Sequence, residues 1–366
     1  MRVLFFHASR EWSGQARVFA SAGRVLASRG YQVTYACPAE SVVERRVADE
    51  GVEPVPMDVG GPWLAQAYRL KQILLDYFVE VVCVHTEHEH LVASTAVKLA
   101  SRGAVVRRTS AGGHLVTERA SRSAMRLAAT GFLFTTSGEL QTAVLPTKRA
   151  LEPVVAEVGV DVTRYEAVRP AARQSLGVPA DGGRVMVCVY DPSSRARAAT
   201  VMRTVAMLAP RHPELRLVMV GRGADHEDLR MHAAALGLTG VVKLLGERDD
   251  YLSIIRAADI GWIAADCDDA AYGALDCMAL RVPVLAERGT VAERYVADGI
   301  TGILLPPGDA PATAATAASF LAHNDERVAM GNAGHVRVAR DFTEARMADG
   351  FEHAVAAARD RTRWIV

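Results

Sequence analysis

The sequence lacks the features that mark membrane-spanning, exported and strongly charged proteins. No stretch approaches the roughly 20 apolar residues that a membrane-spanning helix needs, and the apolar run at residues 2–6 is too short for a signal peptide. The 42 basic residues balance the 42 acidic ones, so the chain offers no overall charge for binding nucleic acid or a membrane. We therefore expect a cytoplasmic protein with no nucleic-acid partner, and peripheral contact with the inner membrane face stays open.

Paired cysteines and a dinucleotide fingerprint are also missing. The five cysteines are odd in number and scattered, without a CxxC motif, as is typical of small core residues in a reducing compartment. No GxGxxG motif follows the first strand-like run, so the sequence does not support a dinucleotide. We expect no cofactor.

One local imbalance of charge stands out. Residues 102–126 carry six arginines against a single acid, Glu118. An arginine-rich solvated surface is one interpretation, and a basic face for an anionic or lipid-linked acceptor is the other.

Alternating strand and helix patterns fill the chain, half of whose residues are apolar. In the first half, strands are expected near 2–6, 32–37, 80–84, 105–109, 131–135 and 154–158, and helices near 14–28, 41–50, 63–77 and 118–129. Ser13 is a plausible N-cap of the first helix, where Gly14 permits a close approach of the backbone to an anion.

The alternation restarts after a bridge rich in Ala, Pro, Arg and Gly at residues 162–183. Strands are expected near 185–190, 216–220, 241–244 and 259–264, with helices near 197–208, 226–236 and 251–257. The fold class is therefore α/β, with two Rossmann-like domains facing across a cleft.

Histidines gather at two strand ends. In HTEHEH, Thr86 and Glu89 form a capping-box pattern, which places His85 at the end of a strand, where parallel sheets bind ligands. The spacing does not match a helical zinc pair, so no metal site is predicted. After the next strand, Gly112 and Gly113 permit a backbone approach to a ligand, and His114 follows.

Two carboxylates stand eight residues apart, at Asp268 and Asp276, ahead of a helix, a short apolar strand and glycine turns. As purely structural groups, Asp268 would cap that helix and Asp276 would lie in its first turn. A third interpretation takes Asp266 and Asp268 as a metal-binding DxD.

Four segments carry a family resemblance: VGVDVTRYEA (158–167), LVMVGRGADHEDLRMHAAALGL (217–238), VVKLLGERDDYLSIIRAADI (241–260), and LDCMALRVPVLA followed by VADGITGILLPPGD. In order and spacing they resemble the retaining GT-B glycosyltransferases of family 4, also called the group 1 family. The resemblance implies an acceptor-binding domain at 1–165, a nucleotide-sugar-binding domain at 166–341, and a C-terminal helix at 342–366 that crosses back onto the first domain.

The resemblance also assigns roles to single residues. The family's Glu-x7-Glu falls on Asp268, which would meet the donor sugar, and Asp276, which would hold the ribose; both are one methylene shorter. The predicted catalytic residues are Asp268, His85, which is chosen for its place at a strand end and not from the resemblance, and His114. Further donor-binding positions are Gly14, Gly221, Gly223, Glu247, Gly273 and Glu293.

Three further positions depart from the family pattern. Asp191 and Ala196 stand where the family has the arginine and lysine that clamp the diphosphate, and the flanking Arg195 and Arg197 are the predicted substitutes. Ala111 stands where the family has an acceptor-side histidine, for which His114 would substitute.

The sequence thus predicts a glycosyltransferase that moves a sugar from a nucleotide-diphosphate donor to an unidentified acceptor. Metal independence and retention of configuration are implied by the resemblance. The alternative is a catalytically impaired GT-B protein that acts as a binding or regulatory subunit. A phosphorylase is disfavoured, because the second half offers only Lys243 for a pyridoxal phosphate. The oligomeric state is not predicted.

Overall fold

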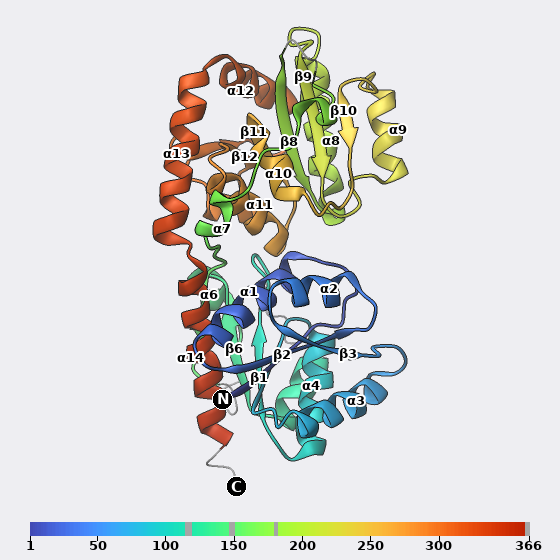
Figure 1. The fold of residues 1–366 in the computed structure, drawn as a ribbon, viewed down its shortest axis with the longest axis vertical. Helices are drawn as coiled ribbons and strands as arrows, with labels where there is room; N and C mark the ends of the chain where they lie inside the picture. Colours follow the sequence, from blue (N-terminus) through green and yellow to red (C-terminus); the bar gives the residue numbers. More distant parts are fainter. Residues whose placement is uncertain (114–118, 146–150, 179–181, 363–366) are drawn as a thin grey trace. The chain divides into compact units, whose positions relative to one another are not determined.

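The computed structural model describes residues 1–113, 119–145, 151–178 and 182–362. It divides into two compact parts: unit 1, Met1–Val158 with Glu344–Val366, and unit 2, Gly159–Thr343. Figure 1 labels their elements. In both units, apolar parallel strands lie between helices, as expected for near-continuous apolar runs that are buried on both faces.

Unit 1 contains a parallel sheet in the order β3-β2-β1-β4-β5-β6-β7. Its strands are β1 (Arg2–Phe6), β2 (Gln32–Pro38), β3 (Glu53–Met57), β4 (Val81–Val84), β5 (Ala104–Arg108), β6 (Thr130–Phe134) and β7 (Val154–Val155). Because β1 pairs with both β2 and β4, the chain changes direction across the sheet at β1 and β4.

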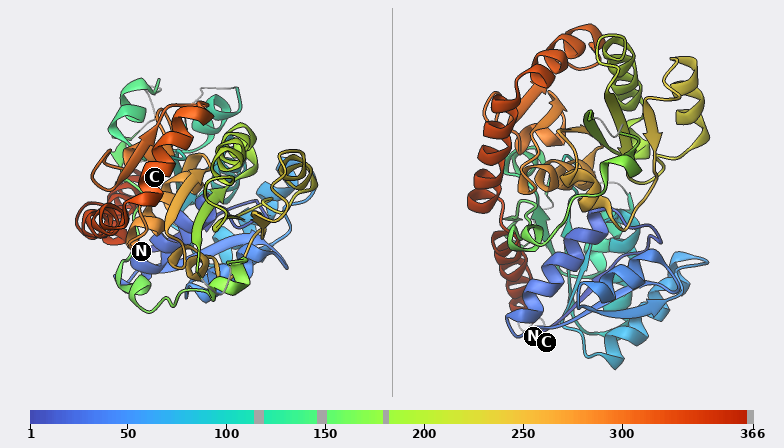
Figure 2. Two further views of the ribbon diagram at one scale, coloured as in Figure 1. Left: turned by 90° about the horizontal axis from the view of Figure 1, so that it is seen from above. Right: turned by 45° about the horizontal axis from the view of Figure 1, so that its top comes forward.

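Helices cover both faces of this sheet. They are α1 (Gly14–Ser28), α2 (Val42–Asp49), α3 (Trp63–Asp76), α4 (Glu87–Ala100), α5 (Arg119–Leu127), α6 (Ser137–Thr142) and α14 (Glu344–Thr362). The blue α1 and the dark red α14 lie side by side in the right-hand view of Figure 2, and their contacts include Arg29 with Glu352 at 2.6 Å. The predicted N-cap Ser13 and the capping box of Thr86 and Glu89 are confirmed.

Unit 2 contains a parallel sheet in the order β10-β9-β8-β11-β12-β13. Its strands are β8 (Arg184–Tyr190), β9 (Leu215–Val220), β10 (Val242–Leu244), β11 (Ile260–Ala264), β12 (Val284–Glu287) and β13 (Gly302–Leu305). Its helices are α7 (Thr163–Glu166), α8 (Arg195–Leu208), α9 (Glu227–Ala235), α10 (Tyr251–Arg256), α11 (Cys267–Ala279), α12 (Ala310–Ala322) and α13 (Asn324–Asp341), with short 3-10 turns η1 (Arg173–Leu176), η2 (Pro192–Ser194) and η3 (Val291–Arg294).

The prediction of two successive α/β units is confirmed, but one strand was not predicted and one helix begins earlier than expected. Strand β3 was not predicted, because its sequence EPVPM contains two prolines; as an edge strand it has one side free of ladder bonds, which tolerates them. Helix α8 begins at Arg195, two residues before the predicted start. None of the helices within the described residues is long and apolar enough to cross a membrane.

Candidate functional site

Ligands of open parallel sheets bind at the carboxyl ends of the strands where the chain changes direction. In unit 2 this point lies between β8 and β11, and in unit 1 between β1 and β4. Most of the predicted site residues follow these strands or those next to them.

Asp191 follows β8 and is held in place by local contacts. Its Oδ1 accepts a hydrogen bond of 2.9 Å from the Ser193 amide, which makes it the N-cap of η2. The carboxylate is buried and forms a short ion pair with Arg222, from the turn after β9. The guanidinium of Arg222 also lies 3.8 Å from Asp269. A cation is thus present beside the position where the family has its clamping arginine, although a different strand supplies it.

Arg197 provides a second cation at the point between β8 and β11 where the chain changes direction. Its Nη1 donates to Ala265 O at 3.2 Å and lies 3.3 Å from the Asp266 carboxylate, both directly after β11. Its Nε lies 3.5 Å from Glu287 at the end of β12. Arg197 therefore reaches the ends of two neighbouring strands.

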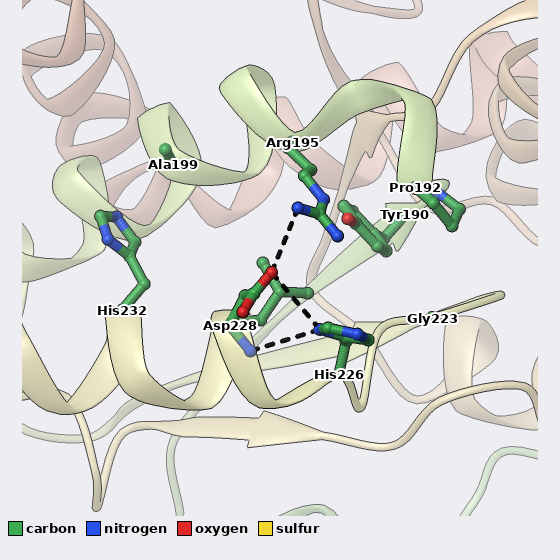
Figure 3. A pocket seen from close by; sticks show the side chains of 9 residues that line it. Tyr190, Pro192, Arg195, Ala199, Gly223, His226, Asp228 and His232 are labelled. Atoms are coloured by element: carbon green, nitrogen blue, oxygen red, sulfur yellow. Dashed lines mark hydrogen bonds and ion pairs between the residues drawn. The ribbon is translucent and has the colours of Figure 1, made fainter.

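Arg195 has different surroundings. It is largely exposed and pairs with Asp228 of α9 at 3.1 Å, beside His226, at the mouth of a pocket of about 230 Å³ (Figure 3). Tyr190, Pro192, Ala199, Gly223, Leu229 and His232 also line this pocket. Burial raises the pKa of Tyr190, and Arg195 partly offsets that effect. Arg195 and Arg197 are two positions apart in the sequence, but their side chains contact different groups of residues: Arg195 pairs with Asp228, and Arg197 pairs with Asp266.

The amino end of α11 is acidic and locally strained. Asp266 is the N-cap, whereas Asp268 is the second residue inside the helix and is fully buried, so the expectation that Asp268 caps the helix is wrong. Between them Cys267 has a φ of 51°, a left-handed conformation that is uncommon for a side-chain-bearing residue. Desolvation, followed by the charges of Asp268, Asp266, Asp269 and Asp191, raises the pKa of the Cys267 thiol to about 12.

Asp276 is the tenth residue of α11, so the expectation of a first-turn acid is wrong: the helix begins at Cys267 and contains both aspartates. At a rise of about 1.5 Å per residue, eight residues separate the two α-carbons by roughly 12 Å along the axis. Asp276 is fully buried, and its Oδ1 accepts a short hydrogen bond from the hydroxyl of Tyr165. Sequence reasoning assigned no role to Tyr165.

The predicted glycines and glutamates around the sheet occupy three kinds of position. Gly221 has a φ of 126°, and a Cβ there would meet Tyr190 O at 2.3 Å, so the turn after β9 requires glycine. Gly273 lets α11 pack on Val189 of β8, where a Cβ would come within 2.9 Å of that side chain. Glu247 is exposed in the turn after β10, and Glu293 accepts a hydrogen bond of 2.6 Å from the Gly289 amide.

In unit 1 the structure brings together residues from the ends of β1 and β4. His85 is buried, stacks on Phe19 with 3.6 Å between ring centroids, and bonds Gln15 O through Nε2 at 2.9 Å. Gly14 is the buried first residue of α1. Sequence reasoning missed His7, which directly follows β1 and lies 3.3 Å from the carboxylate of Glu89.

The acceptor-side prediction from the next strand is only partly within the described residues. Ala111 is buried after β5, and Gly112 donates its amide to Glu139 at 2.8 Å. His114 lies outside the described residues. Among the residues that are described, no group of three or more His, Cys, Asp or Glu side chains is arranged to hold a metal ion.

Comparison with known proteins relates this geometry to glycosyltransferases. Residues 172–337 match the family model of glycosyl transferases group 1. A D-inositol 3-phosphate glycosyltransferase of Corynebacterium kroppenstedtii is 32% identical over 47% of this chain and 41% of its own length. The lipopolysaccharide core biosynthesis glycosyltransferase LpsE of Rhizobium meliloti is 25% identical over 50% of this chain and 53% of its own length. The chain thus spans about half the length of these curated relatives.

Solved structures match over nearly the whole chain at low identity. Anabaena Alr3699/HepE in complex with UDP and glucose has a TM-score of 0.79 at 17% identity and covers 98% of this chain and 100% of its own. A glycosyltransferase from Rickettsia africae has a TM-score of 0.79 at 14% identity and covers 97% of each chain. Residues 172–337 are thus similar to the glycosyl transferases group 1 family, and the two units have the GT-B fold of these solved structures.

Proposed function

We propose that the chain is a glycosyltransferase that moves a sugar from a nucleotide-diphosphate donor to an acceptor hydroxyl, with unit 2 binding the donor and unit 1 the acceptor. The observation that carries the proposal is the pair Arg197, whose side chain reaches the end of β11, and Arg222, which follows β9, in the region that matches the group 1 family model. Relatives of the same fold bind UDP and UDP-glucose, which supports a sugar nucleotide as the donor class.

The main requirement of this reaction is to stabilise the negative charge on the leaving diphosphate. Negative charge grows on its oxygens as the glycosidic bond breaks, and fixed donors lower that barrier most when they are already in place. Arg197 is held by Ser194 Oγ at 2.8 Å and by Ala265 O, so its fork is oriented before a ligand arrives. Arginine side chains of this kind neutralise a diphosphate without a metal. Metal independence and retention of configuration remain part of the proposal through the family resemblance.

The two carboxylates of α11 complete the donor side of the proposal. Asp268, beside the helix start, would meet the sugar, and Asp276, two turns further, would accept from the ribose hydroxyls. The hydroxyl of Tyr165 donates to Oδ1 of Asp276 and so helps to orient this carboxylate.

A second candidate function is supported by the acids around the arginines. Asp191 stands at the position of the family's arginine and pairs with Arg222, and Asp266 pairs with Arg197. A scaffold whose cations are neutralised in this way would suit a binding or regulatory subunit.

Calorimetric titration with UDP-, GDP- and ADP-sugars separates the two functions and tests the arginines. Arg197→Ala or Arg222→Ala should each weaken sugar-nucleotide binding roughly 10- to 150-fold, because a charge-assisted hydrogen bond contributes about 1.5–3 kcal/mol. Arg230→Ala is the matched control, since Arg230 is exposed on α9 and pairs with Glu227. No binding by the wild type across the panel would overturn the transferase, and wild-type affinity in both arginine variants would overturn the clamp.

A further inference from the structure

His7 is a buried base at the carboxyl end of the first strand. Its ring is 2% exposed, and neither ring nitrogen makes a regular hydrogen bond among the described residues: Nδ1 lies 3.3 Å from the Glu89 carboxylate, and Nε2 has no partner. A buried polar nitrogen left in this way costs about 1–3 kcal/mol, so it indicates a partner that the described part of the chain does not supply.

Glu89 on α4 is fixed next to His7 by the backbone. Its Oε1 accepts from the Ala8 amide at 2.8 Å, and its Oε2 accepts from the amides of His85 at 3.0 Å and Thr86 at 2.9 Å. Burial alone would raise the pKa of Glu89, but the hydrogen bond and charge of His7, the charge of His85 and the Thr86 amide lower it to about 2. The carboxylate is therefore charged at neutral pH.

The fixed carboxylate determines the tautomer of His7. Because Glu89 Oε1 lies 3.3 Å from His7 Nδ1 and can only accept, the ring proton belongs on Nδ1, and Nε2 keeps its lone pair. His85 faces the same point, with its ring centroid 6.1 Å from that of His7. Since its Nε2 contacts the carbonyl of Gln15, which also only accepts, His85 donates there and is engaged as a donor. Burial, then the charges of Cys37 and Glu89, raise the pKa of Tyr35 of β2.

We propose that His7, oriented by Glu89, accepts the proton of the acceptor's hydroxyl in unit 1. Its position supports this role, because β1 and β4 are the adjacent strands at which the chain changes direction, where ligands of such sheets bind. Solvent lies one residue away, since residues 8–13 are partly or fully exposed. The inference rests on the proposed transferase function and adds the proton acceptor to it.

The proton balance of the transfer is complete with this residue. The acceptor oxygen forms a bond to the anomeric carbon, whose bond to the diphosphate oxygen breaks, and the bonding pair leaves on the diphosphate. The hydroxyl proton passes to His7 Nε2, and Glu89 stabilises the resulting imidazolium. The proton then leaves to solvent, so no further reactant is needed. General-base catalysis of this kind contributes about 10²- to 10⁴-fold in rate.

The tautomer is testable without any substrate. In the full chain labelled with ¹⁵N-histidine, the His7 signal is assigned by its loss in His7→Asn. At pH 8 we expect a protonated Nδ1 and a lone-pair Nε2. A proton on Nε2, or an imidazolium that persists to pH 9, would overturn the inference.

The catalytic role is tested with UDP-glucose, GDP-mannose and ADP-glucose as donors and water as the acceptor, by measuring release of the nucleotide diphosphate. His7→Asn should lower the rate about 100-fold or more and leave the calorimetric Kd for the donor within twofold. The control His90→Asn removes another buried histidine of unit 1, which lies in α4 and contacts Thr130 Oγ1, and it should leave the rate within twofold. Glu89→Gln should move the acid limb of the rate profile to lower pH, whereas a merely structural role would lower the rate equally at every pH.

The outcomes separate the two proposals. A wild type that binds no sugar nucleotide overturns the proposed function. A wild type that releases the diphosphate while His7→Asn matches it overturns only the role of His7.

Discussion

Tyr165→Phe should destabilise unit 2 through one buried hydrogen bond. The hydroxyl of Tyr165, which is 4% exposed, donates to Asp276, which is fully buried. A hydrogen bond to a charged group contributes about 1.5–3 kcal/mol, and the phenylalanine ring of the variant cannot donate one. We therefore expect the free energy of unfolding of unit 2 to fall by about 2 kcal/mol.

Urea denaturation followed by tryptophan fluorescence measures this effect. Trp262 lies in β11, 1% exposed, in the core of unit 2, so a background with Phe at Trp12, Trp63 and Trp364 reports on that unit. With a denaturant slope of about 2 kcal/mol per molar urea, a loss of about 2 kcal/mol moves the midpoint down by roughly 1 M.

A double-mutant cycle with Asp276→Ala isolates the pair from the other contacts of each residue. The Tyr165→Phe and Asp276→Ala variants should show a coupling energy of about 1–3 kcal/mol, because each single variant removes the same bond. A coupling below about 0.5 kcal/mol would show that the hydroxyl does not support Asp276, and the reasoning from burial would fail.

Two further predictions concern the backbone and pH. Gly221→Ala should lower the free energy of unfolding in urea by more than about 3 kcal/mol, because the φ of 126° and a distance of 2.3 Å from Tyr190 O exclude a Cβ. Gly237→Ala is the control: with a φ of 71° and no atom within 4 Å of the added Cβ, it should lower that free energy by only about 1–2 kcal/mol. Equal losses in the two variants would contradict the prediction. Burial, and then the charge of Arg107, lowers the pKa of His90 to about 3 in the folded chain. As the pH falls below about 6.5, the unfolded chain therefore binds a proton at His90 that the folded chain does not bind. Unit 1 should lose stability on the order of 4 kcal/mol between pH 6.5 and 3. Thermal unfolding by circular dichroism should show this loss in the wild type and much less of it in His90→Asn. The depressed pKa of Glu89 gives stability that is present above about pH 4.5 and is lost as the pH falls towards 2, a window that His90→Asn should leave unchanged.

Local patterns predicted most of the fold because each strand and helix carries its own signal. Ser13 and the Thr86–Glu89 capping box fix helix starts within four residues of sequence, and both were read correctly. The two prolines of β3 argued against a strand. Whether a strand tolerates proline depends on its place at the edge of the sheet, which its own residues do not show.

The site was less predictable because its contacts join distant residues. Arg222 was not among the predicted site residues, yet it reaches Asp191 from the turn after the neighbouring strand, 31 positions away. Tyr165 and Asp276 are 111 positions apart. His7 had a usable signal, a histidine directly after an apolar strand, which is the same argument that singled out His85.

Asp191 and Asp266, which pair with the two arginines of unit 2, affect how tightly a diphosphate would bind more than whether a binding site is present. Arg197 and Arg222 already have carboxylate partners, so an incoming diphosphate exchanges one charged partner for another and gains only the difference between them. That exchange also leaves Asp191 and Asp266 beside the bound anion, where like charges repel it. Tight binding would therefore require the carboxylates to turn away, and weak binding would follow if they stay. In the proposed transferase, these paired carboxylates therefore favour ready release of the diphosphate after transfer.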